Sequence, residues 1–525
     1  MKFGYGQILL FAALTAPISG CAVQIFTPST VASHGGPTSG LTLAPNSQGQ
    51  PSVLLGVGVT APVFSPATVA TGAVVQFTIS PSLPIGLTMD TKTGAISGIA
   101  SHASANTSYV VSAVDAAGAT ASTTFNLRVM DPGHQFSSGY SNLMYLRPNG
   151  SIWAWGEANG GRNGTAETIT PQPSQYALPP EVAAHVTQVS AADTSCVLID
   201  DTIIRCTGAN DKGQVGCASC GDGVDRYAFM DVQPPSGGWG ASLHVRQISS
   251  GPYHACAIVD EGGVLGKIYC WGHNEAGQLG LGTADNVVHA TPDYVRVLGG
   301  MALTGATALS VGNDTTCAVA LGSAYCWGSN NQSQIGSAAA SDPQLTPMVP
   351  TGLTSGVTEI STATYFDYAN SKHTCAIVNG GAKCWGSNYF KQIGNPAAVD
   401  PQVTPLDVTG LSSGAEMIRA QAGSSCAIQA GELYCWGNQD KGHLFNQSSD
   451  ASAGAGQVTP FAANLGAKVV SFAMGEFHTC ALLVTGEMKC VGSNYAGMHG
   501  TGAVDAGGWP GLDHLTPSTC LDSFF

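Results

Sequence analysis

The chain has 525 residues, of which 10 % are charged, 68 are glycine and 28 are proline. This composition is too apolar for a disordered chain and too rich in turn-forming residues for a helical protein, so it favours β structure. The formal net charge of −15 at pH 7 argues against a protein that binds nucleic acid, because such proteins need a basic surface. We therefore expect no nucleic-acid partner.

The N-terminus has the features of an export signal. Lys2 is followed by an apolar stretch from Ile8 to Leu14 and then by Ile18-Ser-Gly-Cys21. A charged start, a short apolar segment and small residues before a cleavage point are typical of a secretory signal rather than a membrane span. The ending Ser-Gly-Cys resembles the lipobox of bacterial lipoproteins, which implies cleavage after residue 20 and lipidation of Cys21. The alternative is an ordinary signal peptide with an incidental cysteine.

The lipobox resemblance also implies a location. Ala22 is not the aspartate of an inner-membrane retention signal, so the outer membrane of a bacterial cell envelope is favoured. No later segment contains 18 unbroken apolar residues, which leaves the lipid as the expected membrane anchor. Residues 21–60 begin with a stretch rich in Ser, Thr, Pro, Gly and Gln, and we interpret them as a flexible tether.

Residues 61–131 have the pattern of a small β domain. Ala73–Ile79, Ser108–Val114 and Thr123–Val129 read as strands. Between them, Leu83-Pro-Ile-Gly-Leu-Thr-Met-Asp-Thr-Lys-Thr-Gly-Ala-Ile-Ser-Gly98 resembles the LPxGLxxDxxTGxIsG signature of bacterial Ig-like, cadherin-like modules. The resemblance implies a β-sandwich that acts as a spacer or adhesive unit. Asp90 and Asp115 lack a dense set of oxygen ligands around them, so we interpret them as turn residues rather than calcium ligands.

The rest of the chain, residues 132–525, is a repeat. Six copies share two cysteines, then in most cases Trp-Gly directly after the second one, and a turn similar to Gln-Leu-Gly further on. A cysteine-free copy begins at Ser138-Gly139 and carries Trp155-Gly156, which makes seven. The six cysteine pairs are Cys196 with Cys206, Cys256 with Cys270, Cys317 with Cys326, Cys375 with Cys384, Cys426 with Cys435 and Cys480 with Cys490.

Successive first cysteines lie 51 to 61 residues apart, a period typical of a β-propeller in which each repeat forms one blade. The copies resemble the repeats of the regulator of chromosome condensation family, G-x-x-H-x-x-A-L followed by G-x-V-x-x-W-G-x-N-x-x-G-Q-L-G. His254, His373 and His478 match the histidine of that pattern. The resemblance covers residues 134–505 and implies a closed ring. We therefore expect an all-β protein, a seven-bladed β-propeller preceded by a small Ig-like β-sandwich.

Hairpin geometry predicts that the two cysteines of each copy form a disulfide. Asn379-Gly380 is a strong type I′ turn, and counting outward from it places Cys375 directly opposite Cys384 at a non-hydrogen-bonded pair. Cα atoms of such pairs lie about 4.5–5.5 Å apart, close enough for a disulfide. The copy with Cys256 and Cys270 carries a longer loop, Glu261–Gly266. Extracytoplasmic folding would let such bonds persist.

Metal and redox roles for the cysteines are less favoured. Cysteines of different blades lie too far apart to share a zinc ion, and no second pair accompanies Cys217-Ala-Ser-Cys220. No thioredoxin-like context surrounds this C-x-x-C, so we expect a local disulfide between Cys217 and Cys220. Cys520 is then left over, either free or paired with one of those two. We expect no metal and no cofactor.

The recurring tryptophans and histidines occupy repeated positions, which suits packing between blades and hydrogen bonding better than a single active site. We find no phosphate loop, no H-E-x-x-H and no nucleophile elbow, so we predict no catalytic residues. Guanine-nucleotide exchange, the namesake's activity, implies a nuclear GTPase that an envelope lipoprotein does not meet. Secreted bacterial propellers of the same repeat type inhibit β-lactamases through one loop-rich face.

We therefore predict a non-enzymatic envelope protein whose propeller binds a protein or a glycan, as an adhesin, receptor or inhibitor. The Ig-like module serves as its spacer. The segments between repeats vary most and are the expected binding regions, for example 222–241, 283–293, 337–350 and 446–460. The alternatives are a propeller enzyme, a lyase or hydrolase acting on envelope polysaccharide or peptide, and a purely structural surface protein.

Overall fold

The computed structural model describes residues 74–505 apart from short gaps, and outside that range the strands β1–β5 and β38. The gaps are residues 85–86, 100–103, 117, 119, 131–134, 148–149, 167, 176–184, 221–222, 365–368 and 449–455. The described part is all-β with four short 3-10 turns, which confirms the predicted fold class. None of its helical segments is long and apolar enough to cross a membrane. Cys21 and Cys520 lie outside the described residues.

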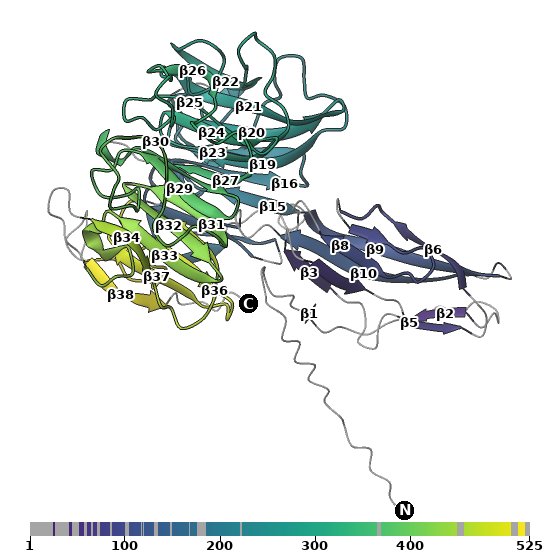
Figure 1. Cartoon of the computed structure of the whole chain (residues 1–525). Helices are drawn as coiled ribbons and strands as arrows, with labels where there is room; N and C mark the ends of the chain where they lie inside the picture. The colour runs from purple at the N-terminus through teal and green to yellow at the C-terminus, as the bar shows by residue number, and fades with distance from the viewer. Residues whose placement is uncertain are drawn as a thin grey trace, which may run out of the picture.

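The N-terminal part of the chain forms a two-layered Ig-like sandwich (Figure 1). One sheet has the order β1-β3-β10-β9-β6 and the other β4-β8-β7, with β2 and β5 as a separate pair. The bounds are β1 Ile25–Phe26, β2 Leu41–Ala44, β3 Ser52–Gly56, β4 Thr60–Phe64, β5 Ala67–Ala70, β6 Val74–Ser80, β7 Leu87–Met89, β8 Ile96–Ile99, β9 Ser104–Asp115 and β10 Thr120–Met130.

Strands β6, β9 and β10 fall on the three predicted segments, and their alternating residues form a core around Phe77, Tyr109 and Phe125. Strand β3 pairs in parallel with β10, although it lies inside the segment that we expected to be a tether. The sandwich therefore extends N-terminal of residue 61, because this sheet needs an early strand to cover the edge of β10.

Asp90 closes the turn between β7 and β8. Its carboxylate accepts hydrogen bonds from the backbone N–H groups of Lys92 at 2.7 Å and Thr93 at 3.1 Å. These two N–H groups hold the pKa of Asp90 below its usual value. The signature aspartate is thus a turn residue in this structure.

Seven four-stranded antiparallel sheets follow and are arranged as the blades of a ring (Figure 1). Blades one to three are β11–β14 (Phe136–Ser138, Asn142–Leu146, Ile152–Glu157, Ile169–Gln175), β15–β18 (Val186–Ser190, Thr194–Ile199, Ile203–Gly208, Arg226–Asp231) and β19–β22 (His244–Ser250, His254–Glu261, Val264–Asn274, Asp285–Tyr294). Blades four and five are β23–β26 (Ala306–Val311, Thr315–Ala320, Ser323–Gly328, Gln344–Met348) and β27–β30 (Val357–Thr362, His373–Val378, Gly381–Gly386, Gln402–Asp407). Blades six and seven are β31–β34 (Ala415–Gln421, Ser424–Gln429, Glu432–Gly437, Gln457–Ala462) and β35–β38 (Val469–Met474, His478–Leu483, Met488–Ser493, Asp513–Thr519). The 3-10 turns are η2 Asn159–Gly161, η3 Ala218–Cys220, η4 Ala369–Ser371 and η5 Asp440–Gly442.

Every blade consists of four strands that are consecutive in the sequence, so the first and last blades share no sheet. Side-chain packing closes the ring instead. Phe136, Leu143 and Trp155 of the first blade form one buried cluster with residues of the last blade, among them Leu482 and Met498. Burying such a cluster of large apolar side chains stabilises the closed ring.

The second and third strands of six blades form the hairpins that carry the cysteines. The structure contains every predicted disulfide within them: Cys196 to Cys206, Cys256 to Cys270, Cys317 to Cys326, Cys375 to Cys384, Cys426 to Cys435 and Cys480 to Cys490. The two cysteines of each pair lie directly opposite each other in the strand register, as counting outward from the turn predicted. A seventh disulfide joins Cys217 and Cys220, also as expected.

The paired strands are closer at the disulfides than the prediction assumed. The Cα atoms of each of the six pairs are 4.1 Å apart, just below the range expected for a non-hydrogen-bonded pair, because the covalent bond holds the strands together. All twelve sulfur-bearing side chains of these pairs are buried. The disulfides are therefore part of the core between the blades.

Two details of the hairpins differ from expectation or extend it. In the third blade the predicted loop Glu261–Gly266 is mostly strand, since the turn is Gly262-Gly263 and a bulge lies between Val259 and Glu261. In the first blade the positions of the two cysteines are filled by Met144 and Ala154, which lie opposite each other and are both buried. A hairpin of this ring can therefore be packed without a disulfide.

The cysteine-free blade provides a matched design for measuring the stabilisation. The double variant Cys375→Met with Cys384→Ala reproduces the Met144/Ala154 pair and is expected to lower the free energy of unfolding by about 2–3 kcal/mol, because the unfolded chain loses a cross-link. Removing the Cys217–Cys220 bond, whose sequence separation is only 3, is the control with a smaller loss. Denaturant unfolding without reductant measures both. Equal losses, or free thiols at Cys375 and Cys384 in non-reducing mass spectrometry, would contradict this account.

Candidate functional site

The first strand of every blade lines a central channel. Strands β11, β15, β19, β23, β27, β31 and β35 contribute side chains to one cavity of about 620 Å³. The channel is the candidate functional site because all seven blades contribute side chains to it. Its shape depends on how each blade is fixed to the next.

A tryptophan hydrogen bond fixes most neighbouring blades to each other. The indole Nε1–H of Trp327 donates to the backbone carbonyl of Gln278 in the preceding blade at 2.9 Å. Equivalent bonds of 2.8–2.9 Å run from Trp271 to Gln214, Trp385 to Gln334, Trp436 to Gln392 and Trp155 to Met498. The bond from Trp155 to Met498 joins the first blade to the last. The repeated Trp-Gly and Gln-Leu-Gly motifs are thus the two halves of one interface.

The Gln-Leu-Gly turn is shaped by its own side chains. In the fourth blade, Asn330 Oδ1 accepts the N–H of Ile335 at 3.1 Å, and Gln334 Oε1 accepts the N–H of Gln332 at 2.8 Å. The same two bonds recur around Gln214, Gln278 and Gln392. The turn therefore holds its carbonyl in place for the tryptophan of the next blade.

The glycine that ends this turn lies against the tryptophan ring. A Cβ atom on Gly336 would be 2.6 Å from Trp385 Nε1, and the φ of Gly336 is +81°. Gly352 has nearly the same φ, +80°, but a Cβ there would meet nothing within 4 Å. Comparing these two glycines distinguishes two reasons for glycine: both positions have a left-handed backbone, but only Gly336 also lacks space for a side chain.

Gly336→Ala is expected to destabilise the ring more than Gly352→Ala. Both changes place a side chain at positive φ, which costs about 1–2 kcal/mol, and only Gly336→Ala also pushes the Trp385 ring away from Gln334. Chemical unfolding of the two variants measures the difference. Equal destabilisation would show that the tryptophan contact does not matter.

The recurring histidines are buried hydrogen-bonding groups between blades. The ring of His254 lies 2.7 Å from Thr316 Oγ1, that of His373 2.8 Å from Ser425 Oγ and that of His478 3.0 Å from Ser138 Oγ. In each case the hydroxyl belongs to the next blade. Burial lowers the pKa of His254 and His478 to about 3 and that of His373 to about 4. These imidazoles are therefore neutral at pH 7 and serve the structure.

The burial of these three histidines predicts that the protein becomes less stable in acid. An unfolded histidine titrates near pH 6.5, so the unfolded state binds more protons below that pH and stability falls as the pH drops from about 6.5 toward 3–4. For His254 alone the loss between pH 7 and pH 5 is about 2 kcal/mol. In His254→Gln, whose amide can still reach Thr316, the loss over this range should be smaller. Thermal unfolding at the two pH values tests this, and parallel curves for both proteins would contradict it.

An ionic network joins the first blade to its neighbours. Arg162 lies 3.0 Å from carboxylate oxygens of both Glu157 and Asp193, and Tyr495 of the last blade lies 3.3 Å from Glu157. Burial raises the pKa of Asp193 and of Tyr495. No group of three or more His, Cys, Asp or Glu side chains in the described part of the chain is arranged to hold a metal. The network links blades one, two and seven.

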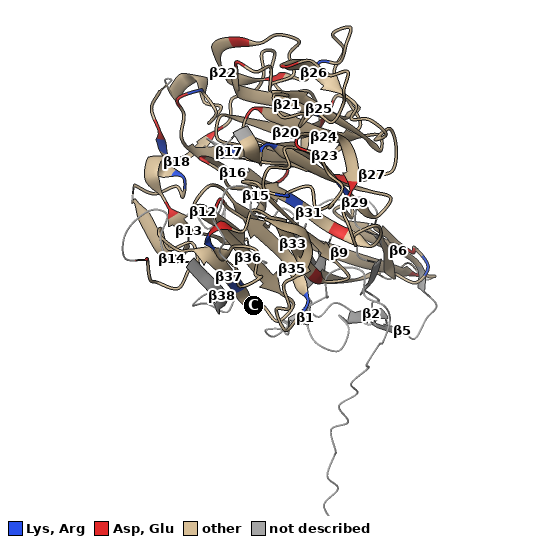
Figure 2. Ribbon diagram, turned by 60° about the vertical axis from the view of Figure 1, so that its left-hand side comes forward, with Lys and Arg blue, Asp and Glu red and all other residues tan. Residues whose placement is uncertain are grey.

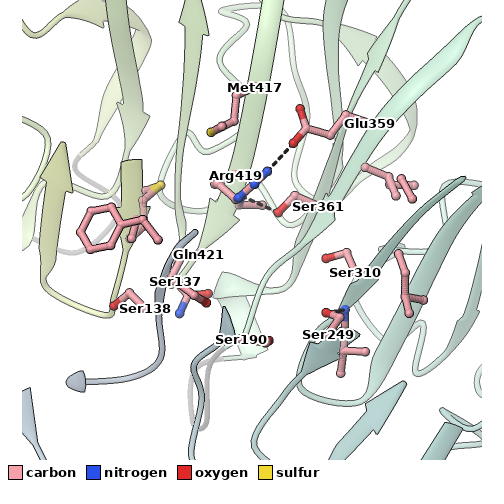
Figure 3. Close-up of a pocket in the computed structure, with 18 of the residues that line it drawn as sticks. Ser137, Ser138, Ser190, Ser249, Ser310, Glu359, Ser361, Met417, Arg419 and Gln421 are labelled. Carbon is pink, nitrogen blue, oxygen red and sulfur yellow. Dashed lines mark hydrogen bonds and ion pairs between the residues drawn. The ribbon is translucent and has the colours of Figure 1, made fainter. Parts of the chain in front are cut away.

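A serine occupies one register position in five consecutive channel strands. Ser137, Ser190, Ser249, Ser310 and Ser361 each accept a hydrogen bond from a backbone N–H of the next blade, at 2.9–3.0 Å. The sixth blade places Arg419 at this position and the seventh places Ala473. Figure 3 shows the serines around the channel, with Arg419 and Glu359 paired on one side.

The channel residues were not predicted from the sequence, although a signal exists. Ser249 and Ser310 both lie seven residues before the first cysteine of their repeat, but Ser190 lies six before and Ser361 fourteen before. The insertion between β27 and β28 hides the last of these. The repeat spacing alone therefore does not align the five serines.

The predicted variable segments contain more regular structure than expected. Segments 222–241, 283–293, 337–350 and 446–460 each include all or part of an outer strand, β18, β22, β26 or β34. A Thr-Pro pair marks this strand in six blades, for example Thr346-Pro347 and Thr404-Pro405. Proline is tolerated there because the outermost strand of a blade has a free edge.

Comparisons with known proteins agree with this geometry. The sequence matches the family described as Putative Ig domain over residues 29–130. It matches the regulator of chromosome condensation (RCC1) repeat over residues 245–278, 266–319 and 469–497. The propeller is built from RCC1-type repeats.

Solved structures share the fold. Human WBSCR16 superposes with a TM-score of 0.55 and 20 % identity, covering 69 % of this chain and 89 % of that one. Prp20p from Saccharomyces cerevisiae gives 0.59 and 19 %, covering 74 % and 88 %. Among curated proteins, the E3 ubiquitin-protein ligase HERC2 of Homo sapiens is 24 % identical over 353 residues, 66 % of this chain but 7 % of its own length. The ultraviolet-B receptor UVR8 of Arabidopsis thaliana is 23 % identical over 328 residues, 59 % of this chain and 67 % of that protein.

Proposed function

We propose that this protein is a non-catalytic binding module of the bacterial cell envelope, in which the RCC1-type propeller holds a protein or glycan ligand and the Ig-like domain is a spacer. The proposal rests on a difference between two parts of each repeat, the residues that join strands and blades and the connections between the third and fourth strands. The repeated Trp, Gln, His and Cys residues join strands and blades. The connections between the third and fourth strands mostly share the Gln-Leu-Gly turn but differ in length from blade to blade, for example residues 275–284 in the third blade and residues 438–456 in the sixth.

Those connections share one face of the ring. In an antiparallel blade the connection from the first to the second strand and that from the third to the fourth leave from the same edge. The long connections include 209–225, 329–343, 387–401 and 438–456. We name this side the long-loop face. A rigid scaffold that presents variable loops is a common way to build a recognition surface.

The charge distribution suits a ligand that is not a polyanion. Charged residues are sparse and scattered along the described ribbon (Figure 2), and the formal net charge is −15. Proteins that share the fold bind other proteins: the solved Prp20p is described with its binding to Gsp1p and histones, and yeast RCC1 (Prp20) has been solved with Kap60 bound to it. Protein recognition by RCC1-type proteins therefore has precedent.

Paired surface variants test the binding function. Ala339→Arg with Val399→Arg changes exposed residues on two connections of the long-loop face. Leu298→Arg with Met301→Arg is the matched control on a connection between blades, at the opposite edge. The chain from residue 22 onward should retain a stoichiometric partner from envelope extracts, and only the long-loop variant should weaken this about tenfold or more. Turnover of envelope polysaccharide or peptide with no retained partner would favour an enzyme instead.

The envelope location rests on the lipobox-like stretch and on the disulfides, which persist outside the cytoplasm. Cells that express the full chain should incorporate labelled palmitate into it and keep it in the membrane fraction. Cys21→Ser should abolish the label and release the protein, because no acyl chain can then be attached. Unchanged membrane association of Cys21→Ser would rule out the lipid anchor.

A further inference from the structure

Serine hydroxyl groups from several blades line the channel. At the serine position, five hydroxyl groups from consecutive blades follow its wall, and Ser137, Ser249 and Ser310 are half-buried rather than fully covered. Each of these oxygens accepts a backbone N–H of the next blade. A hydroxyl that accepts one hydrogen bond can still donate its own hydrogen. The channel wall therefore offers O–H donors to whatever occupies it.

Backbone N–H groups of the channel strands are less available to a ligand than the serine hydroxyls are. The N–H groups of Ile248, Leu309 and Ile418 donate to the side chains of Gln188, Gln247 and Glu359 in the preceding blades, at 3.0–3.1 Å. Two residues further along, the N–H groups of Ser250, Val311 and Ala420 donate to the serines. An extended peptide binds a strand edge through alternate backbone groups of this kind. These edges are already capped, which disfavours a peptide strand as the occupant.

The charge of the channel disfavours an ionic occupant. Its charged lining residues are Glu359, Glu416 and Arg419. Arg419 is paired with Glu359, and its Nη1 also donates to the carbonyl of Ile418 at 2.7 Å. An acidic ligand would meet a cation that already has a carboxylate partner. A basic ligand would meet the carboxylate of Glu416, but this side chain is exposed to solvent, where an ion pair contributes little. A neutral polar ligand fits this lining best.

We propose that the channel binds a neutral sugar unit, the end of a glycan one or two residues long. Sugar hydroxyl groups both donate and accept, as the serine hydroxyls do, and carry no charge. The cavity of about 620 Å³ lies within the range of small-ligand sites. Ala308, Met417 and Phe472 supply apolar wall for the carbon face of the ring. This inference rests on the proposed binding function and names its ligand class and site.

The variants that test the channel avoid its hydrogen bonds where possible. Ala308 is half-buried on the channel wall, so Ala308→Trp fills the space while removing no side-chain hydrogen bond. Leu298→Trp adds the same side chain at an exposed position on the edge of the ring opposite the long-loop face and is the matched control. Ser310→Ala removes one hydroxyl, and Ser310→Thr retains it. If Ala308→Trp does not fold, the two Ser310 variants still decide.

Isothermal titration with the disulfide-bonded chain from residue 22 onward measures binding of maltose, cellobiose, lactose and N,N′-diacetylchitobiose, with a hyaluronan disaccharide as the acidic counterpart. At least one neutral disaccharide should bind. Its affinity should fall about tenfold or more in Ala308→Trp and in Ser310→Ala, stay unchanged in Leu298→Trp, and be retained in Ser310→Thr, which keeps the hydroxyl.

Three results would overturn the proposal: no neutral disaccharide binds, only the acidic one binds, or binding survives both Ala308→Trp and Ser310→Ala. A partner that is retained normally while no neutral disaccharide binds would overturn the sugar site and leave the general binding function standing. Failure to retain any partner on the long-loop face would instead remove the general function. The two failures are therefore distinguishable.

Discussion

The ring depends on the hydrogen bond between a tryptophan N–H and the carbonyl of the preceding blade. A single four-stranded blade leaves apolar surface on both faces, so each blade is stable only against its neighbours. The Trp385 indole is buried between two blades and its N–H has one acceptor, Gln334 O, at 2.8 Å. An unsatisfied indole in that position would be costly. The bond therefore ties the tryptophan of one blade to the Gln-Leu-Gly turn of the preceding blade.

Two interfaces lack the tryptophan, and in both the facing Gln-Leu-Gly turn has a different sequence as well. The second blade has Thr207 in place of tryptophan, and the facing turn of the first blade has Arg162-Asn163-Gly164 in place of Gln-Leu-Gly. Thr207 Oγ1 lies 3.0 Å from Gly161 O across the interface and 2.7 Å from Arg226 O in its own blade, so its one hydrogen is shared between these two carbonyls. The seventh blade has Val491, and the facing turn of the sixth blade has His443, which bonds Ser424 within its own blade. Each substitution thus preserves the pairing of polar groups by a different means.

Features that depend on neighbouring residues of one hairpin could be predicted from the sequence. The cysteine register follows from two turn residues, Asn379 and Gly380, because an antiparallel hairpin counts outward from its turn. The tryptophan and histidine positions could be recognised as structural, but not assigned partners, since each partner lies in another repeat, 44 to 62 residues away where the two repeats are adjacent in the sequence. The N-terminal limit of the sandwich was missed because β3 is a parallel strand with no turn to mark it.

The channel combines a repeated serine position with a break in the repeat. Five blades place a serine at one register position, and each of these hydroxyls accepts a hydrogen bond from the next blade. Arg419 and Ala473 break that series on one side of the ring. The Arg419–Glu359 pair is only half-buried, so its Coulombic contribution to stability is small, although Glu359 also accepts the N–H of Ile418 in the next blade. The break gives an otherwise symmetric channel one polar, oriented wall, and an oriented wall is what distinguishes a binding site from packing.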